Sequence, residues 1–207
     1  MTIFPKKIVA LGAHYDDAEI GCGCTIKGHS MIGDDVHMIV FNPENDRSGS
    51  SETRLIEQQT SLHKLKIPLE NLHLVDSLDD DLKYENLVAI VDKLKPDILF
   101  LPYWNDTHQH HRRVSEIGQS VLRNRNIEGY FYMSGSSIDF KPNVFNLIDY
   151  NFKSALLKCF TSQIKNNSLR VDLIMDSSKY FGSIISEPSY NSNYAEAFHI
   201  RRINYKR

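Results

Sequence analysis

The sequence contains few cysteines, only three in 207 residues. An odd number of cysteines argues against a disulfide framework and fits a reducing compartment. Cys22 and Cys24 form a C-x-C pair, but Cys159 stands alone and no second pair completes a zinc site. We therefore interpret Cys22 and Cys24 as small packing residues.

The sequence also lacks long apolar runs and a large excess of one charge. Residues 8–12 are too few for a signal-peptide core, and no run approaches the roughly 20 residues of a membrane-spanning helix. The formal net charge is −2, and lysine and arginine are scattered, so we expect no nucleic-acid or anionic-membrane partner. These absences predict a cytoplasmic protein that acts on a small molecule, and they are compatible with a homo-oligomer.

No internal repeat or low-complexity linker divides the chain. With 41% hydrophobic residues, the 207 residues can bury one substantial core but hardly two. We therefore expect a single domain over residues 1–207.

Apolar runs and helical patterns alternate along the chain, which predicts an α/β fold. We expect a Rossmann-like three-layer sandwich with a mostly parallel sheet, because β-α-β connections are right-handed and place helices on both faces. The expected strands are residues 6–12, 35–41, 71–75, 97–102, 129–133, 144–148 and 195–203. The expected helices lie within residues 21–30, 52–65, 87–94, 114–122, 152–164 and 169–185. Loops are expected at 42–51, as a mobile rim of the site, and at 186–193.

A histidine and two aspartates follow the first strand. His14 lies where the strand ends, and Asp17 falls in the first turn of the next element. An imidazole and a carboxylate at this spacing can converge on one cation, which leaves the adjacent Asp16 for acid/base work.

A second cluster, Asp106-Thr107-His108-Gln109-His110-His111-Arg112, follows the fourth strand. In an open parallel sheet the loops after the first and fourth strands meet where the strand order reverses, and ligands bind there. Either cluster alone is also typical of turn residues that cap a helix. The two together predict a shared metal site at the C-terminal ends of these strands.

Gly21 and Gly23 follow a strand and invite a dinucleotide-binding interpretation. That motif needs a third glycine at position 26, where this chain has Ile26, and backbone amides where charged side chains stand. We expect no nucleotide cofactor.

The two clusters resemble the signatures of the PIG-L/LmbE-like zinc-dependent N-deacetylases. The family patterns are approximately A-H-[PA]-D-D-x-E-x-G-x-G-G-T and D-x-H-x-D-H. The matching segments here are Ala13-His14-Tyr15-Asp16-Asp17-Ala18-Glu19-Ile20-Gly21-Cys22-Gly23-Cys24-Thr25 and Asp106-Thr107-His108-Gln109-His110-His111. The similarity covers essentially the whole chain and continues at Arg54-Leu55-Ile56-Glu57 and Tyr194-Ala195-Glu196-Ala197-Phe198.

The resemblance implies a hydrolase that removes an N-acetyl group from an amino sugar or a sugar conjugate. It implies that His14, Asp17 and His111 hold a Zn²⁺ ion that activates a water, and that Asp16 is the base. Donors of these types also accept Fe²⁺, Co²⁺ or Mn²⁺.

Further roles follow from the same resemblance. A protonated His108 would stabilise the oxyanion and protonate the leaving amine, with Asp106 and His110 fixing its ring. Arg54 and Tyr194 would contact the sugar. From the residues alone, Arg54 is also compatible with a surface ion pair on its helix, and Tyr194 with packing.

Three positions depart from the family patterns. Tyr15, Cys24 and His110 stand where the family carries proline or alanine, glycine and aspartate, respectively. His110 keeps open the alternative of a metal-binding member that has lost catalysis. Another alternative is a zinc hydrolase that acts on a different amide or an ester.

Two other features are expected to have no site role. The acidic run Asp79-Asp80-Asp81 precedes a helical pattern, where acidic side chains suit solvent and the helix dipole. Five further histidines show no partner spacing: His29, His37, His63, His73 and His199.

Overall fold

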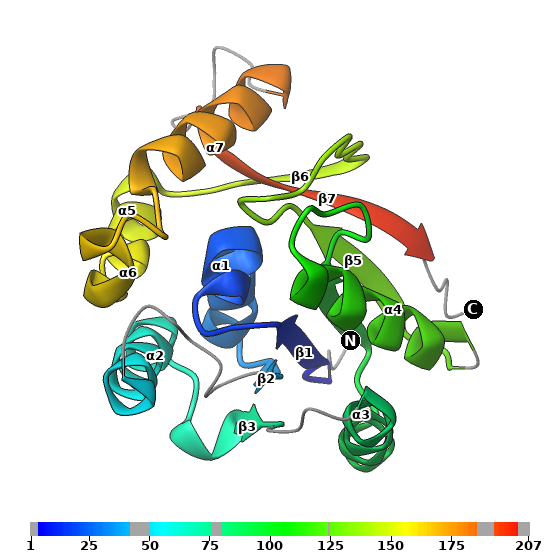
Figure 1. Ribbon diagram of the computed structural model, residues 1–207. Helices are drawn as coiled ribbons and strands as arrows, with labels where there is room; N and C mark the ends of the chain where they lie inside the picture. The colour runs from blue at the N-terminus through cyan, green and yellow to red at the C-terminus, as the bar shows by residue number, and fades with distance from the viewer. Residues whose placement is uncertain (1–3, 42–49, 76–79, 124, 186–192, 203–207) are drawn as a thin grey trace.

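The computed structural model describes residues 4–41, 50–75, 80–123, 125–185 and 193–202. Within them, one seven-stranded sheet carries helices on both faces (Figure 1), which confirms the predicted α/β fold. The elements in chain order are β1 (Lys7–Gly12), α1 (Asp17–Met31), β2 (Asp35–Val40), α2 (Ser51–Leu65), the 3₁₀ turn η1 (Leu69–Asn71), β3 (Leu72–Leu74), α3 (Asp80–Leu94), β4 (Ile98–Pro102), α4 (Gln109–Arg123), β5 (Glu128–Tyr132), β6 (Val144–Leu147), α5 (Tyr150–Leu157), α6 (Thr161–Lys165), α7 (Val171–Ile185) and β7 (Ala195–Arg202).

The strand order is β3-β2-β1-β4-β5-β7-β6. Strands β1 to β5 pair in parallel, and β7 and β6 extend the sheet by antiparallel pairing. The chain runs outward from β1 to β3 and then places β4 on the other side of β1. The strand order therefore reverses between β1 and β4, where open α/β sheets form a crevice for ligands.

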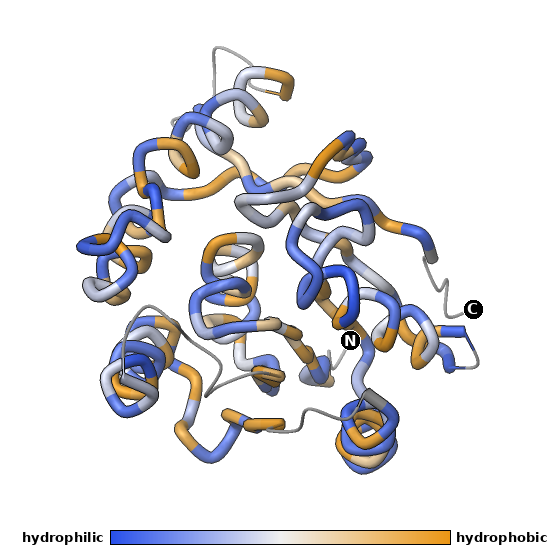
Figure 2. Tube along the Cα trace, viewed as in Figure 1, coloured by the Kyte–Doolittle hydropathy of each residue, from blue (hydrophilic) through white to orange (hydrophobic). Residues whose placement is uncertain are grey.

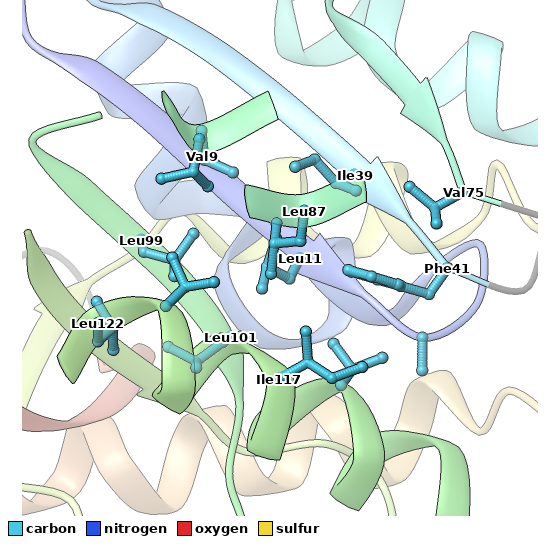
Figure 3. Close-up of a cluster of buried hydrophobic side chains, with 14 of the residues drawn as sticks. Val9, Leu11, Ile39, Phe41, Val75, Leu87, Leu99, Leu101, Ile117 and Leu122 are labelled. Atoms are coloured by element: carbon cyan, nitrogen blue, oxygen red, sulfur yellow. The ribbon is translucent and has the colours of Figure 1, made fainter. Parts of the chain in front are cut away.

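Alternate residues of β1 explain why helices cover both faces. Val9 and Leu11 lie in one apolar cluster with side chains of α3 and α4, part of which Figure 3 shows. Ile8 and Ala10 lie in a second cluster with side chains of α1, α2 and α5. In Figure 2 the helices carry both hydrophobic and hydrophilic residues along their turns, as expected for elements with one buried face.

Gly21 brings α1 close to the sheet. A Cβ atom there would overlap the ring of Tyr132, whose hydroxyl donates a hydrogen bond to the Leu11 carbonyl at 2.6 Å. Helix packing therefore accounts for this glycine.

Some predicted boundaries are wrong. The helix expected over residues 152–164 is two helices, because the chain leaves helical geometry at Phe160, with φ −92° and ψ 60°. The Phe160 ring is fully buried against Leu169 and its neighbours. The helix expected from residue 114 begins at Gln109, so His110 and His111 belong to its first turn.

The loops predicted at 42–51 and 186–193 lie almost wholly outside the described residues, as does Asp79. Asp81 is exposed at the start of α3. Among the described residues, no helix combines the length and the apolar character needed to cross a membrane.

Candidate metal centre

The segments that follow β1, β4 and β5 meet at the crevice between β1 and β4. They surround a cleft of about 1010 Å³, near the upper end of the range for small-molecule sites. Both histidine clusters line it, together with Arg54 of α2 and Ser136 from the loop after β5. Two clusters that are distant in the sequence therefore share one cavity.

The structure brings together the three residues predicted to bind a metal, His14, Asp17 and His111. Their ligand atoms lie within 4.8 Å of one another. Nδ1 of His14 is 3.5 Å from Oδ2 of Asp17, and Nε2 of His111 is 3.3 Å from Oδ1 of Asp17.

The ring of His111 is oriented for a cation. Its Nδ1 faces Oδ2 of Asp106 at 3.2 Å, which leaves Nε2 facing Asp17. Burial lowers the pKa of His111, but the two carboxylates outweigh burial and raise this pKa to about 10. For Asp17 the effects have the opposite signs: burial raises its pKa, but His111 and His14 outweigh burial and hold this pKa well below its usual value.

The opposite pKa shifts of His111 and Asp17 favour a charged pair that shares one proton. The same two groups would bind a divalent cation after losing that proton, and His14 supplies a third donor. Two imidazoles and one carboxylate, with an open cleft beside them, fit a catalytic metal position.

Asp106 anchors the second cluster. Its carboxylate accepts hydrogen bonds from the hydroxyls of Ser134, Ser136 and Ser137. Burial raises its pKa, but bonds from the His111 ring and the serines lower it far below its usual value. The expectation that Asp106 fixes the His108 ring is wrong, since the carboxylate contacts the ring of His111 and only the backbone amide of His108, at 2.8 Å.

The serines at 134, 136 and 137 were not predicted from the sequence. They directly follow β5, whose C-terminal end lies at the same edge of the sheet as the ends of β1 and β4. Small polar residues after a parallel strand at that edge were the available signal.

Asp16 occupies a strained position at the start of α1. It is the N-cap residue, with φ 91° and ψ −25°, a left-handed conformation that is uncommon outside glycine. Nη2 of Arg54 donates a hydrogen bond to the Tyr15 carbonyl at 2.5 Å and lies 3.5 Å from Oδ2 of Asp16. Arg54 is 1% exposed, so the alternative of a surface ion pair is wrong.

His108 lies on the exposed side of the cleft. Its Nδ1 accepts a hydrogen bond from the backbone amide of His110 at 3.2 Å, so the proton of the neutral ring is on Nε2. Burial and then the imidazoles of His111 and His14 lower the pKa of His108 to about 4. This lowered pKa favours a neutral ring over the protonated His108 that the resemblance implies, and the catalytic role of His108 stays a prediction.

His110 also differs from the expectation that it fixes the His108 ring. Nδ1 of its own ring lies 2.9 Å from Nε2 of His14. The hydrogen bond from His110 to His108 comes from the backbone. The side chain that replaces the family aspartate thus adjoins a candidate metal ligand.

Tyr194 is not among the described residues that line the cleft. Its ring packs against Tyr150 with centroids 4.9 Å apart, so the structure favours packing over a sugar contact.

The structure also places the cysteine and the histidines for which no site role was expected. Cys22 lies in the core, as predicted. The sequence shows no partner spacing for His37 and His73, but in the fold they contact each other at 3.1 Å between Nδ1 and Nε2. His29 also has a partner, Asp34, at 2.7 Å.

A buried ion pair supports α1 from behind the cleft. Nζ of Lys153 lies 2.6 Å from Oε1 of Glu196, and their side chains are 0% and 2% exposed. Lys153 also donates to the carbonyls of Glu19 and Ile20 at 2.9 and 2.7 Å. Glu196 accepts from the amide of Cys24 at 2.8 Å. Lys153 was not predicted from the sequence, because no pattern marks it.

A family model matches the part of the chain that contains both clusters. The model described as GlcNAc-PI de-N-acetylase (PIG-L) matches residues 9–122. This range is more than half of the chain and contains every residue of the candidate metal position.

Three solved structures share the fold. N,N'-diacetylchitobiose deacetylase from Pyrococcus horikoshii, complexed with its inhibitor MPG, is 22% identical, with a TM-score of 0.72 and coverage of 94% of this chain and 83% of that chain. The zinc-inhibited form of teicoplanin deacetylase Orf2 is 10% identical, with a TM-score of 0.71 and coverage of 94% and 97%. GalB, the 4-carboxy-2-hydroxymuconate hydratase from Pseudomonas putida KT2440, is 15% identical, with a TM-score of 0.77 and coverage of 98% of both chains. At these identities the similarity shows the fold alone.

Proposed function

The chain belongs to the GlcNAc-PI de-N-acetylase (PIG-L) family, and from this premise we propose that it removes an N-acetyl group from an amino sugar or a sugar conjugate by metal-dependent hydrolysis. The observation that carries the proposal is the convergence of His14, Asp17 and His111 beside Asp16 in an open cleft. Two of the solved structures with this fold are described as deacetylases, which supports the reaction type.

The metal position in this proposal consists of His14, Asp17 and His111. A Zn²⁺ ion bound there would supply a Lewis acid and would lower the pKa of a bound water to roughly 7. Fe²⁺, Co²⁺ and Mn²⁺ suit the same donors. Asp106 holds the His111 ring so that Nε2 faces the metal position.

Asp16 is the base in this proposal. Its carboxylate lines the cleft next to Asp17, but it belongs to neither group of candidate ligands found in the described residues. Asp16 takes a proton from the attacking water, while Arg54 holds the turn from which the carboxylate projects. A positioned base of this kind contributes typically about 10²–10⁴-fold to the rate.

His108 stabilises the carbonyl oxygen in this proposal. The Nε2–H of its neutral ring donates a hydrogen bond to the amide oxygen, and this bond strengthens as negative charge develops there. Because His108 is neutral, the proton that the departing amine needs comes from Asp16, which received it from the water. This step replaces the proton transfer from His108 that the resemblance implies.

A hydratase is the second candidate, because GalB has the same fold with a TM-score of 0.77. Hydration also needs a water and a base, so Asp16 suits either reaction. The products differ, however, since hydration adds water across a double bond and releases neither acetate nor amine.

A substrate screen separates these candidates. We expect the zinc-loaded protein to release equal amounts of acetate and free amine from an N-acetylglucosamine derivative, and the Asp16→Asn protein to release neither at a comparable rate. Hydration of 4-carboxy-2-hydroxymuconate without any deacetylation would favour the second candidate. Cleavage of acetyl esters alone would show that the protein hydrolyses an ester bond. Bound zinc without turnover of any substrate would indicate a family member that has lost catalysis.

A further inference from the structure

His14 belongs to two groups of side chains with metal-ligand spacing in the described part of the chain. One group contains Asp17 and His111, and the other contains His108 and His110. The two groups lie next to different nitrogen atoms of the His14 ring. Nδ1 is 3.5 Å from Asp17, whereas Nε2 is 2.9 Å from Nδ1 of His110. From this arrangement we propose that His14, His108 and His110 form a second, weaker zinc position next to the first, with the His14 ring bridging the two ions.

The three rings lie close together in the lining of the cleft. The ring of His14 lies with its centroid 4.8 Å from that of His108 and 5.1 Å from that of His110. The centroids of His108 and His110 are 5.0 Å apart. Nε2 of His108 binds an ion when the ring takes its other tautomer: the proton moves from Nε2 to Nδ1, and the hydrogen bond from the His110 amide to Nδ1 is lost. Each ring thus offers one nitrogen atom, and the ligand atoms lie within 4.8 Å of one another.

Exposure and charge make this position the weaker one. His108 is exposed and His110 is half-buried, whereas Asp17 and His111 are buried. A carboxylate neutralises part of the ion's charge in the first group, but the second group contains no carboxylate. Three imidazoles favour Zn²⁺, Cu²⁺ or Ni²⁺ over Mn²⁺ and Mg²⁺, which prefer oxygen donors. The second position therefore selects more strongly for zinc than the first.

Binding at the second position exchanges an ion for a proton. When Nδ1 of His14 faces the first ion, Nε2 keeps the ring proton and donates it to Nδ1 of His110. The second zinc ion displaces this proton to solvent and takes the lone pairs of both nitrogen atoms, with no change in oxidation state. His110, which stands where the family carries an aspartate, supplies the third imidazole of this position.

The second ion also occupies Nε2 of His108. The proposed function assigns to this atom the hydrogen bond to the amide oxygen, so filling the second position inhibits hydrolysis. This consequence rests on the proposed function, whereas the binding of the second ion does not.

Equilibrium dialysis of the metal-free protein against Zn²⁺ tests the binding. We expect two ions per wild-type chain with different affinities, one ion per chain in His110→Ala and in His110→Gln, and two in the control His63→Ala, which removes an exposed imidazole from α2. A wild-type chain that saturates at one ion would overturn the inference. So would a His110→Ala chain that keeps the second ion with unchanged affinity.

Activity measured against added metal tests the consequence. Excess Zn²⁺ should inhibit the wild type, and at least about tenfold more zinc should be needed to inhibit His110→Ala, while excess Mn²⁺ should not inhibit either protein. Two bound ions without inhibition would contradict the role of the second position. One bound ion with activity would refute the second position alone, whereas a wild-type chain that binds no ion would refute the proposed function itself.

Discussion

Arg54 donates a hydrogen bond from Nη2 to the carbonyl oxygen of Tyr15 at 2.5 Å. This bond ties α2 to the turn in which Asp16 has a φ of 91°, and the same Nη2 lies 3.5 Å from Oδ2 of Asp16. The family resemblance predicts a sugar contact for Arg54. Arg54 lines the cleft, and from its burial and its bond to Tyr15 we propose that it positions Asp16.

Replacement of this arginine separates the two roles. Arg54→Lys keeps the charge but loses the planar fork, so the Asp16 carboxylate should shift. We expect kcat to fall by about 10²-fold, the scale of an ångström-sized misplacement, with little change in KM. The measurement is steady-state kinetics on an N-acetylated sugar.

The control for this variant is Arg123→Lys, at the exposed end of α4, which should behave like the wild type. A large increase in KM with kcat retained in Arg54→Lys would show that Arg54 binds the substrate directly.

Asp16→Asn tests the proposed base. The amide has almost the same shape as the carboxylate but cannot take a proton from water, so kcat should fall by roughly 10²-fold or more. The zinc content should stay at the wild-type value, because the metal position lies on His14, Asp17 and His111. If this variant turned over at the wild-type rate, a residue other than Asp16 would be the base.

His110→Asp tests how position 110 affects His108. Burial and neighbouring imidazoles, including that of His110, lower the pKa of His108 to about 4. An aspartate removes one imidazole and adds a negative charge that favours the imidazolium, so the pKa of His108 should rise. The measurement is an NMR titration of the histidine rings in the metal-free proteins. A pKa that stays constant or falls would show that position 110 does not tune His108.

If a protonated His108 were needed for turnover, activity would be lost as the pH rises through its pKa. The alkaline limb of the pH–rate profile would then move upward in His110→Asp. In the proposed mechanism His108 acts as a neutral donor, so the alkaline limb should not follow the pKa measured by NMR.

Much of the site follows from local patterns and topology. The apolar runs predicted β1 and β4, and parallel strands end at the same edge of a sheet. The convergence of His14 and His111 therefore needed no knowledge of side-chain packing. The spacing within the first turn singled out Asp17 and Asp16, and the resemblance then picked His111 out of the second cluster.

The remaining features depend on tertiary contacts that no local pattern records. Asp106 has two histidines within reach in sequence, and only the fold shows that its carboxylate faces the ring of His111. The lowered pKa of His108 results from burial and from neighbouring rings, among them that of His14 in a distant segment. Likewise, Lys153 meets Glu196 only after α5 and β7 have packed around α1.

Lys153→Met tests the buried ion pair behind α1. The substitution leaves the charge of Glu196 buried without its partner, which should lower the free energy of unfolding by roughly 3–5 kcal/mol. Urea denaturation of the metal-free protein measures this change. The double variant Lys153→Met/Glu196→Gln should regain part of the loss, because no unpaired charge remains.

The exposed pair formed by Arg170 and Asp172 provides the control, since Asp172→Asn should leave the free energy of unfolding nearly unchanged. Equal losses for the buried and the exposed pair would contradict the supporting role of Lys153.

The proposed mechanism depends above all on His14, Asp17 and His111 holding the catalytic ion. Crystals of the protein loaded with one equivalent of Zn²⁺, measured on both sides of the zinc absorption edge, provide the decisive test. We expect one anomalous peak at roughly 2.0–2.2 Å from a nitrogen of His14, an oxygen of Asp17 and Nε2 of His111. A zinc peak bound by other residues, or the absence of a peak at these three, would contradict the mechanism.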